Sequence, residues 1–194
     1  MKRCNPTERD ELLDVGVTDQ DSPDANYLEW SYRYPHRVTA AGLMAESPFH
    51  PQLFSSLRYV QITDSRLPFE DRAFDVVHSS AVLEHVGGKR AQWRFLGELW
   101  RVCRRVLYVT TPNRWAPVEF HTGLPLLHWL PQKAWSACAR RLGHEFYSRD
   151  ENLRLLGTAG LERLAVKAGM PNACVSSVKL LGWASNLVLH SVRS

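Results

Sequence analysis

The sequence predicts a doubly wound α/β domain: a mostly parallel sheet of seven strands with a helical insertion after the fifth strand. Short apolar, β-branched segments alternate with helical stretches along the chain, which is the pattern of βαβ units. The 194 residues are 44% hydrophobic and 23% charged, ordinary values for one globular domain over residues 1–194. No apolar run reaches the length of a membrane span, so we expect no membrane partner.

The N-terminal part of the chain supplies the first four predicted strands. Each is a short apolar or β-branched run that ends at a glycine or a polar residue. They are Leu12–Gly16, Arg37–Leu43, Leu57–Ile62 and Phe74–Ser79. A short helix is expected between the first two strands, at Asn26–Tyr34, because Pro35 closes an aromatic-rich stretch there.

The clearest predicted helix is Arg90–Arg105. Its apolar side chains recur at spacings of three and four residues, at Trp93, Leu96, Trp100 and Cys103. A fifth strand follows at Val106–Thr111, stopped by Pro112. The stretch 114–157 breaks the alternation, and since so long a structureless loop is uncommon, we expect a helical cover there over the carboxyl end of the sheet.

The C-terminal part completes the sheet. Thr158–Gly169 is a predicted helix with Thr158 as its N-cap and Gly169 as its stop. The segments Val175–Leu180 and Ala184–Val192 are expected to pair as a hairpin across Gly182 and Trp183.

Composition excludes several classes of protein. Four separated cysteines without metal-ligand spacing predict reduced thiols in a cytoplasmic protein. The acidic loop around Asp19, Asp21 and Asp24 lacks the spacing of a calcium loop, so no metal site is expected. A net charge of +4 without a basic run argues against nucleic acid as a partner. The oligomeric state stays open, with a homodimer among the alternatives.

The segment after the third strand carries a recognisable pattern. It reads Leu67-Pro68-Phe69-Glu70-Asp71-Arg72-Ala73-Phe74-Asp75-Val76-Val77, and Leu83-Glu84-His85 follows. This pattern resembles the central signature of the type 11 group of class I methyltransferases, which use S-adenosyl-L-methionine (SAM) and have a Rossmann-like sheet. The resemblance spans about Leu12 to Met170 and implies SAM as the cofactor.

The resemblance also assigns cofactor-binding residues to the ends of the strands, where open α/β sheets bind ligands. Asp14, Gly16 and Val17 stand in the first SAM loop. Asp64 and Ser65 match the residues that hold the adenine, and Ser79 and Ser80 match the positions beside the methionine moiety. The remaining expected contact is Glu46, which follows the second strand.

Two departures from the family pattern weaken the expected cofactor site. The first loop continues as Val17-Thr18-Asp19 instead of with further glycines. Met44 stands near the place of the acidic residue that binds the ribose, and a thioether is a weak acceptor. Losing a hydrogen bond to a charged group costs about 1.5–3 kcal/mol, so SAM binds weakly unless Glu46 compensates.

Methyl transfer to a hydroxyl also needs a base. His121, in the predicted cover, is the first candidate, His85 is the second, and Glu119 is the third. For both histidines a purely structural role is the competing interpretation. Trp129 and Trp135 either pack the cover onto the sheet or line an acceptor pocket.

The sequence therefore favours a SAM-dependent methyltransferase that acts on a small molecule. One alternative is a non-catalytic protein of the same fold that binds a ligand or a partner, which the missing loop glycines favour. A second alternative is a methyltransferase of nucleic acid, which requires a contiguous basic face.

Overall fold

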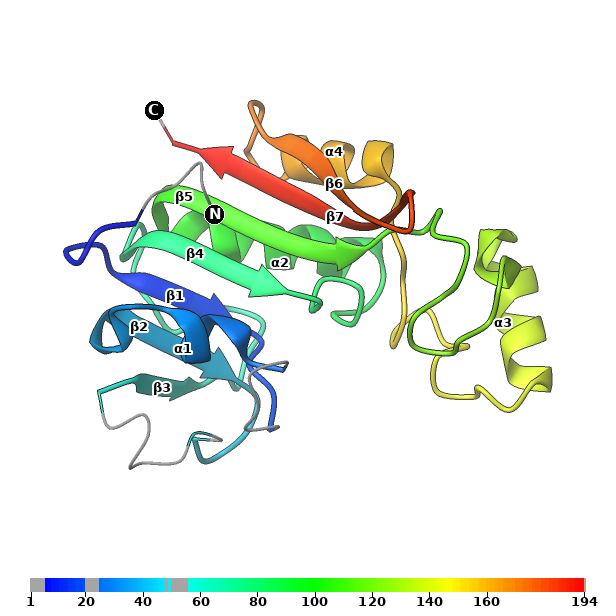
Figure 1. Cartoon of the computed structure of the whole chain (residues 1–194), viewed down its shortest axis with the longest axis horizontal. Helices are drawn as coiled ribbons and strands as arrows, with labels where there is room; N and C mark the ends of the chain where they lie inside the picture. Colours follow the sequence, from blue (N-terminus) through cyan, green and yellow to red (C-terminus); the bar gives the residue numbers. More distant parts are fainter. Residues whose placement is uncertain (1–5, 20–24, 48, 50–55, 194) are drawn as a thin grey trace. The chain divides into compact units, whose positions relative to one another are not determined.

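The computed structural model describes residues 6–19, 25–47, 49 and 56–193. Hydrogen bonding places seven strands in the order β3-β2-β1-β4-β5-β7-β6, so the predicted α/β sheet is confirmed (Figure 1). The first four strands are β1 (Leu12–Val15), β2 (Val38–Gly42), β3 (Arg58–Gln61) and β4 (Phe74–Ser80). The last three are β5 (Cys103–Pro112), β6 (Cys174–Leu180) and β7 (Trp183–Val192).

The chain divides into two compact units. The first takes in the described residues up to Ser80, together with 98–108 and 192–193, and the second takes in 81–97 and 109–191. The expectation of one domain with a cover over residues 114–157 stays a prediction. None of the helices in the described part of the chain combines the length and the apolar character that a membrane crossing requires.

The first unit is centred on three parallel strands. Register pairs Asp14 of β1 with Ala40 of β2 on one side and with His78 of β4 on the other. β3 joins the outer side of β2 in parallel. All residues of β1 and β2 are buried, as expected for parallel strands covered on both faces.

Helix α1 (Tyr27–Ser31) covers these strands with one apolar side chain. Its Leu28 joins a buried cluster with Leu12, Val38 and Val76. The helix is shorter than the predicted Asn26–Tyr34, because Tyr32 is already extended and Pro35 opens the 3-10 turn η1 (Pro35–Arg37). The helical backbone is therefore limited to Tyr27–Ser31, and the buried side chains of this short helix are Leu28 and Glu29.

Helix α2 (Lys89–Val102) confirms the predicted amphipathic helix but ends three residues before Arg105. The reason lies in the side chains that follow it. Arg104 pairs with Asp75, and Arg105 pairs with Asp10, as residues of strand β5. These ion pairs hold both arginines in extended backbone, whereas Leu96, Leu99 and Val102 are fully buried from the helix.

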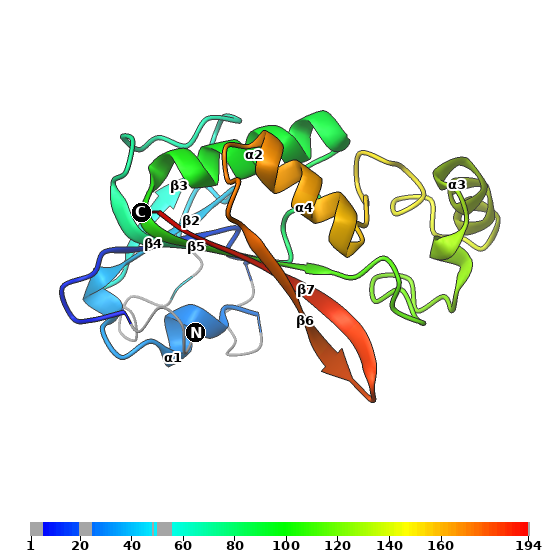
Figure 2. The same ribbon diagram turned by 90° about the horizontal axis from the view of Figure 1, so that it is seen from above.

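The second unit holds the C-terminal hairpin and two helices. α4 (Thr158–Lys167) lies beside the β6–β7 hairpin (Figure 2). The turn is formed by Leu181 and Gly182, both with positive φ, and not by Gly182 and Trp183 as predicted. Trp183 instead pairs with Leu180 across the hairpin.

The predicted N-cap of α4 is wrong by one residue. Gly157 is the N-cap, and Thr158 is the first helical residue. A Cβ atom at Gly157 would lie 2.6 Å from Trp115 Nε1, so the indole excludes any side chain at this cap. Residues 114–157 otherwise hold the 3-10 turn η2 (Leu127–Trp129) and helix α3 (Gln132–Arg141).

Candidate functional site

The first expected cofactor residue, Asp14, lies at the tip of β1 and is 7% exposed. Its Oδ1 lies 2.8 Å from Nδ1 of His78 on the neighbouring strand β4. Burial lowers the pKa of His78, but the charge and hydrogen bond of Asp14 outweigh it, so the pKa is raised. The two side chains therefore form a buried ion pair beside the end of the strand.

Glu29 of α1 is a third titratable side chain near Asp14 and His78, and the sequence did not predict it. It is 2% exposed, and neither of its carboxyl oxygens has a hydrogen-bond partner among the described residues. Burial, followed by the charge of Asp14, raises its pKa to about 9. Glu29 is therefore neutral at pH 7, beside the contact between Asp14 and His78. A lone acidic residue in a five-residue helix left no signal in the sequence.

The loop after β1 turns sharply at Gly16, which has a φ of 102°. Its N–H donates to the carbonyl of Ala41 at 2.8 Å, and the N–H of Val17 donates to the same oxygen at 3.3 Å. A positive φ at this tip accounts for the glycine. The side chain of Val17 is buried with Ala40 and Phe49, so it belongs to the core as well as to the expected cofactor loop.

The end of β2 is closely packed. A Cβ atom at Gly42 would lie 3.1 Å from Tyr59 Oη and from Val17 Cγ2. Met44 accepts a hydrogen bond from Tyr59 through its carbonyl oxygen, at 2.8 Å. Glu46, the expected substitute for the ribose carboxylate, is exposed to solvent. The nearest acidic side chain after β2 is therefore on the surface and outside this packed group.

Ser79 and Ser80 occupy the end of β4. The Ser79 hydroxyl is fully buried and donates to the carbonyl of Val15 at 2.8 Å, which ties the ends of β1 and β4 together. Ser80 is exposed. The structure thus brings Asp14, Gly16 and Ser79 together, in agreement with their expected neighbourhood.

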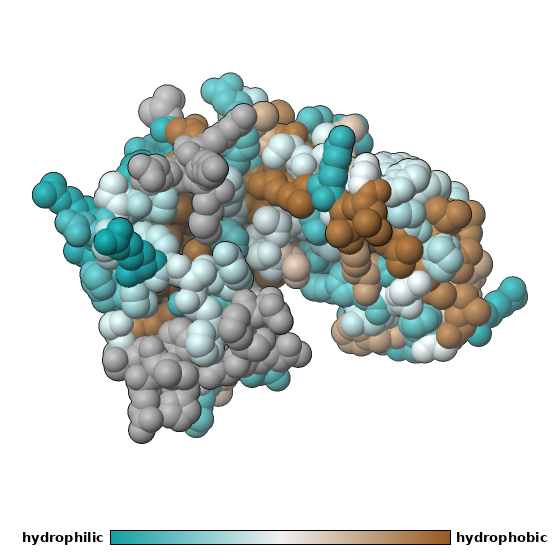
Figure 3. Space-filling model, viewed as in Figure 1, coloured by the Kyte–Doolittle hydropathy of each residue, from teal (hydrophilic) through white to brown (hydrophobic). Residues whose placement is uncertain are grey.

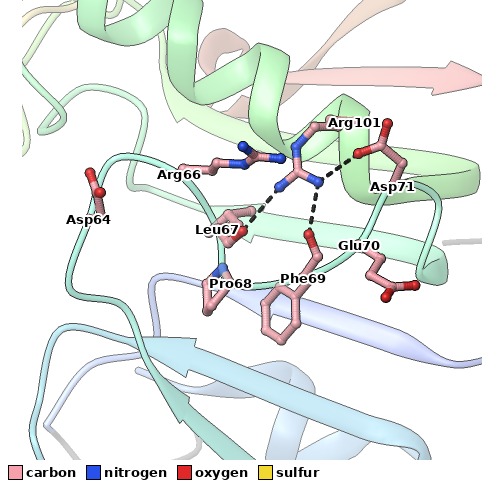
Figure 4. Close-up of a pocket in the computed structure, with 8 residues that line it drawn as sticks. All are labelled: Asp64, Arg66, Leu67, Pro68, Phe69, Glu70, Asp71 and Arg101. Carbon is pink, nitrogen blue, oxygen red and sulfur yellow. Dashed lines mark hydrogen bonds and ion pairs between the residues drawn. The ribbon is translucent and has the colours of Figure 1, made fainter.

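Asp64 and Ser65 follow β3 and are both exposed, with the Ser65 hydroxyl 3.1 Å from Asp64 Oδ1. Their hydrogen bond is local to the turn and does not extend to the group at the tips of β1 and β4. Asp64 instead lies at the rim of a cavity of about 550 Å³, lined by the Leu67–Asp71 segment and Arg101 (Figure 4).

The cavity beside Asp64 is lined by the Leu67–Asp71 segment, which is held in place by hydrogen bonds from Arg101. The Arg101 guanidinium donates to the carbonyls of Leu67 and Phe69 and to the carboxylates of Asp71 and Glu98. Glu98 in turn accepts from the backbone N–H of Leu67. Because these groups take up the guanidinium donors, Arg101 holds the Leu-Pro-Phe turn against α2 and is not presented to a ligand.

The three expected catalytic residues lie together in the second unit. His85 Nε2 is 2.9 Å from His121 Nε2, and their rings are edge to face. His121 Nδ1 lies 2.7 Å from Glu119 Oε1, and His85 Nδ1 lies 2.8 Å from the carbonyl of Asn152. Glu84, next to His85, is fully buried and accepts a hydrogen bond from Thr111. Asn152 and Thr111 could not be assigned from the sequence.

The pKa values of Glu119 and Glu84 are shifted in opposite directions. Burial alone would raise the pKa of Glu119. Hydrogen bonds from the side chain and the backbone N–H of His121 and from Thr122 outweigh burial and lower this pKa to about 2. Glu119 in turn raises the pKa of His121 against the effect of burial. Burial raises the pKa of Glu84. The cluster therefore holds an ionised Glu119 beside an imidazole that readily takes a proton.

One aromatic neighbour of this cluster is Tyr147, whose ring centroid lies 5.4 Å from that of His121. Trp135 is buried with Ala139, Leu153 and Leu155, which agrees with the packing alternative. Figure 3 shows apolar surface over the region that carries α3. Exposed apolar side chains between residues 114 and 130 include Trp115, Phe120, Leu126, Trp129 and Leu130.

Comparison with known proteins gives one family match. Residues 27–106 match the family model described as a methyltransferase domain. This segment contains the Leu-Pro-Phe turn and Leu83-Glu84-His85 but begins after Asp14 and Gly16. No curated protein matches the sequence.

Solved structures of similar fold cover nearly the whole chain. A SAM-dependent methyltransferase from Methanosarcina mazei is 16% identical, with a TM-score of 0.60 over 97% of this chain and 94% of its own. A possible histamine N-methyltransferase from Thermotoga maritima is 14% identical, with a TM-score of 0.57 over 100% and 86%.

A third structure was solved with a bound cofactor product. Magnesium protoporphyrin IX methyltransferase from Synechocystis, with bound S-adenosylhomocysteine (SAH), is 13% identical, with a TM-score of 0.55 over 95% of this chain and 74% of its own. The chain therefore has the Rossmann-like fold of SAM-dependent methyltransferases.

Proposed function

Residues 27–106 of this chain match a methyltransferase domain, and from that premise we propose that the protein transfers a methyl group from SAM to a small-molecule acceptor. The observation that carries the proposal is the junction of β1 and β4. There Gly16 turns with a positive φ, and the buried Ser79 hydroxyl binds the carbonyl of Val15. A side-chain-free turn at the carboxyl end of parallel strands fits a nucleoside-type ligand.

When bound, SAM supplies the electrophilic methyl group on its sulfonium. The chain's own part is to position the donor and to accept the acceptor's proton. Asp14, Gly16, Val17, Ser79 and Ser80 would hold the methionine side, and Asp64, Ser65 and Glu46 the nucleoside side. His78 holds the Asp14 side chain in place through the 2.8 Å contact between its Nδ1 and Asp14 Oδ1.

For a hydroxyl acceptor, His121 is the proposed base, with His85 as the next candidate. Glu119 orients His121 through its Nδ1 and stabilises the imidazolium that forms. Tyr147, with its ring centroid 5.4 Å from that of His121, and the exposed Phe120 next to His121 in the chain favour an acceptor with an apolar, ring-shaped part, because such pockets are commonly lined by aromatics.

Isothermal titration with SAH tests the donor half of the proposal. SAH is unreactive, so heat reports binding alone. We expect wild-type protein to bind SAH and Gly16→Ala to weaken binding at least about tenfold, since a Cβ is strained at this φ and approaches the ligand. The matched control is Gly143→Ala, because Gly143 has a φ of 87° and a Cβ added there would meet no atom within 4 Å.

Two outcomes would contradict the donor assignment. One is wild-type protein that is folded by circular dichroism and shows no binding at about 1 mM SAH, which is weaker than about −4.1 kcal/mol. The other is equal affinity for Gly16→Ala and Gly143→Ala, which would place the ligand away from the tip of β1.

A specific observation favours a second candidate, a non-catalytic protein of the same fold. Val17 is buried with Ala40 and Phe49, so apolar packing fills the loop after β1, and the exposed Glu46 carboxylate lies outside it. Absence of SAH binding in the titration above would support this candidate.

A further inference from the structure

The contact between His85 and His121 has an unusual protonation requirement. The carbonyl of Asn152 can only accept, so His85 Nδ1, 2.8 Å away, must carry a proton. His121 Nδ1 lies 2.7 Å from Glu119 Oε1, which also accepts from the His121 backbone N–H, so Nδ1 carries a proton as its donor. Both Nε2 atoms of the neutral rings then present lone pairs to each other at 2.9 Å. Such a contact becomes favourable when one of the two nitrogens takes a proton or when a bound cation lies between them.

Glu84 provides an independent sign of a missing cation. Its side chain is fully buried, yet Oε1 has no hydrogen-bond partner among the described residues. The other oxygen, Oε2, accepts from the Thr111 hydroxyl at 2.9 Å. Oε1 lies 4.0 Å from His85 Nε2, and the ligand atoms of Glu84, His85 and His121 all lie within 4.8 Å of one another. A buried carboxylate oxygen without a donor is costly, and a bound cation would satisfy it.

We propose that Glu84, His85 and His121 bind one divalent transition-metal ion of the Zn²⁺ type. One ligand atom of each residue lies within 4.8 Å of the others. Two imidazole nitrogens and one carboxylate are a ligand set that zinc accepts, and they leave a fourth position open. Magnesium and calcium prefer oxygen ligands and fit this set poorly.

The surroundings of the three ligands fit a metal site as well. Metal-binding imidazoles commonly donate their other N–H to a carboxylate or a backbone carbonyl. Here Glu119 accepts from His121 Nδ1 and the carbonyl of Asn152 accepts from His85 Nδ1. Thr122 in turn donates to Glu119 through its backbone N–H. Tetrahedral zinc places two nitrogens about 3.3 Å apart, so the rings need to separate by only a few tenths of an ångström.

Spacing could not reveal this site in advance. His85 and His121 are 36 positions apart in the sequence, and they come into contact only in the folded second unit. The ion would occupy the lone pair that the proposed base uses. Proton removal would then pass to the ion, which lowers the pKa of a bound hydroxyl or water. Ion binding itself does not depend on methyl transfer.

The test is a titration of Zn²⁺ into the untagged full chain, freed of metal with a chelator, in the absence of SAM. We expect one ion per chain and a loss of affinity of at least about 100-fold in His121→Ala and about tenfold in Glu84→Gln. His144→Ala is the matched control, as a histidine of the same unit outside the cluster, and should bind as wild type.

Cobalt adds a readout that reports the ligands. Co²⁺ in the proposed site should give the visible absorption of a four- or five-coordinate ion without a thiolate charge-transfer band, since no cysteine is among the ligands. Zn²⁺ should raise the thermal unfolding midpoint of wild type and not of His121→Ala.

The proposal is overturned if folded wild-type protein binds no Zn²⁺ below about 100 µM, if His121→Ala binds like wild type, or if a thiolate band appears. Should Glu84→Gln fail to fold, His121→Ala decides, because His121 is partly exposed and outside the apolar core.

Discussion

Single side chains carry most of the unusual chemistry of this chain, and Glu29 is the clearest example. It is buried beside Asp14 with both carboxyl oxygens unpartnered among the described residues. Two ionised carboxylates cannot share so small a buried space, so one of them keeps its proton. Burial is the largest cause of the raised pKa of Glu29, followed by the charge of Asp14, so Glu29 is the neutral one.

This neutral acid makes stability depend on pH. The pKa of Glu29 is about 9 in the folded chain against an ordinary value of 4.5, so between these values the folded state holds the extra proton. Its stabilising effect is present at low pH and is lost as pH rises through this window, by at most about 1.4 kcal/mol per pH unit. We expect Glu29→Gln to flatten the pH dependence of the free energy of unfolding, measured with urea from about pH 6 to about pH 8.

The control is Glu70→Gln, since Glu70 is exposed and its substitution should leave the slope of wild type unchanged. An unchanged slope in Glu29→Gln would mean that Glu29 is ionised in the folded chain and reaches water.

Residue identities at the strand ends were predictable, but their partners were not. The alternation of strands is enough to expect Asp14, Gly16 and Ser79 near one another, and their contacts agree. The His78–Asp14 pair and the packing of Val17 depend on register between strands, which the sequence does not encode locally. The protonation of the two facing imidazoles depends on Asn152, a carbonyl that no side-chain pattern reveals.

At the scale of elements, strands and the long helix were predicted within a few residues, and the errors lie at the ends. Each end is decided by a contact from elsewhere in the chain. Ion pairs at Arg104 and Arg105 end α2 early, and the Trp115 indole moves the cap of α4 to Gly157. Local propensity favours Thr158 as a cap, but packing overrides it.

A pair of glycine substitutions tests this account of the elements. Gly157→Ala places a Cβ against the Trp115 indole, and we expect it to destabilise the chain by about 1–3 kcal/mol. Gly97→Ala lies within α2 with no atom within 4 Å of its new methyl group, and we expect it to stabilise by about 0.5–1 kcal/mol. Urea unfolding of both variants gives the comparison. Equal effects would show that Trp115 does not constrain the cap.

At the scale of the whole molecule, the balance of charge bears on the nucleic-acid alternative. The chain has 24 basic and 20 acidic residues, for a net charge of +4. Many of the arginines are paired with carboxylates: Arg37 with Glu11, Arg104 with Asp75, Arg105 with Asp10, and Arg154 with Asp150. Each pair places a carboxylate beside a guanidinium, so these four arginines add little local positive potential to attract phosphates.

This balance predicts weak binding to nucleic acid. A DNA-binding protein that neutralises several phosphates releases as many counterions, so its affinity falls steeply as salt increases. We expect the fluorescence anisotropy of a labelled duplex to show a dissociation constant no tighter than about 10⁻⁴ M at physiological salt, with a shallow dependence on salt. Glu11→Lys frees Arg37 and adds a cation, so it should steepen that dependence if the pairing is what suppresses binding. A wild-type affinity in the micromolar range with a steep salt slope would contradict the charge argument, and a polynucleotide would then replace the small molecule as the proposed acceptor.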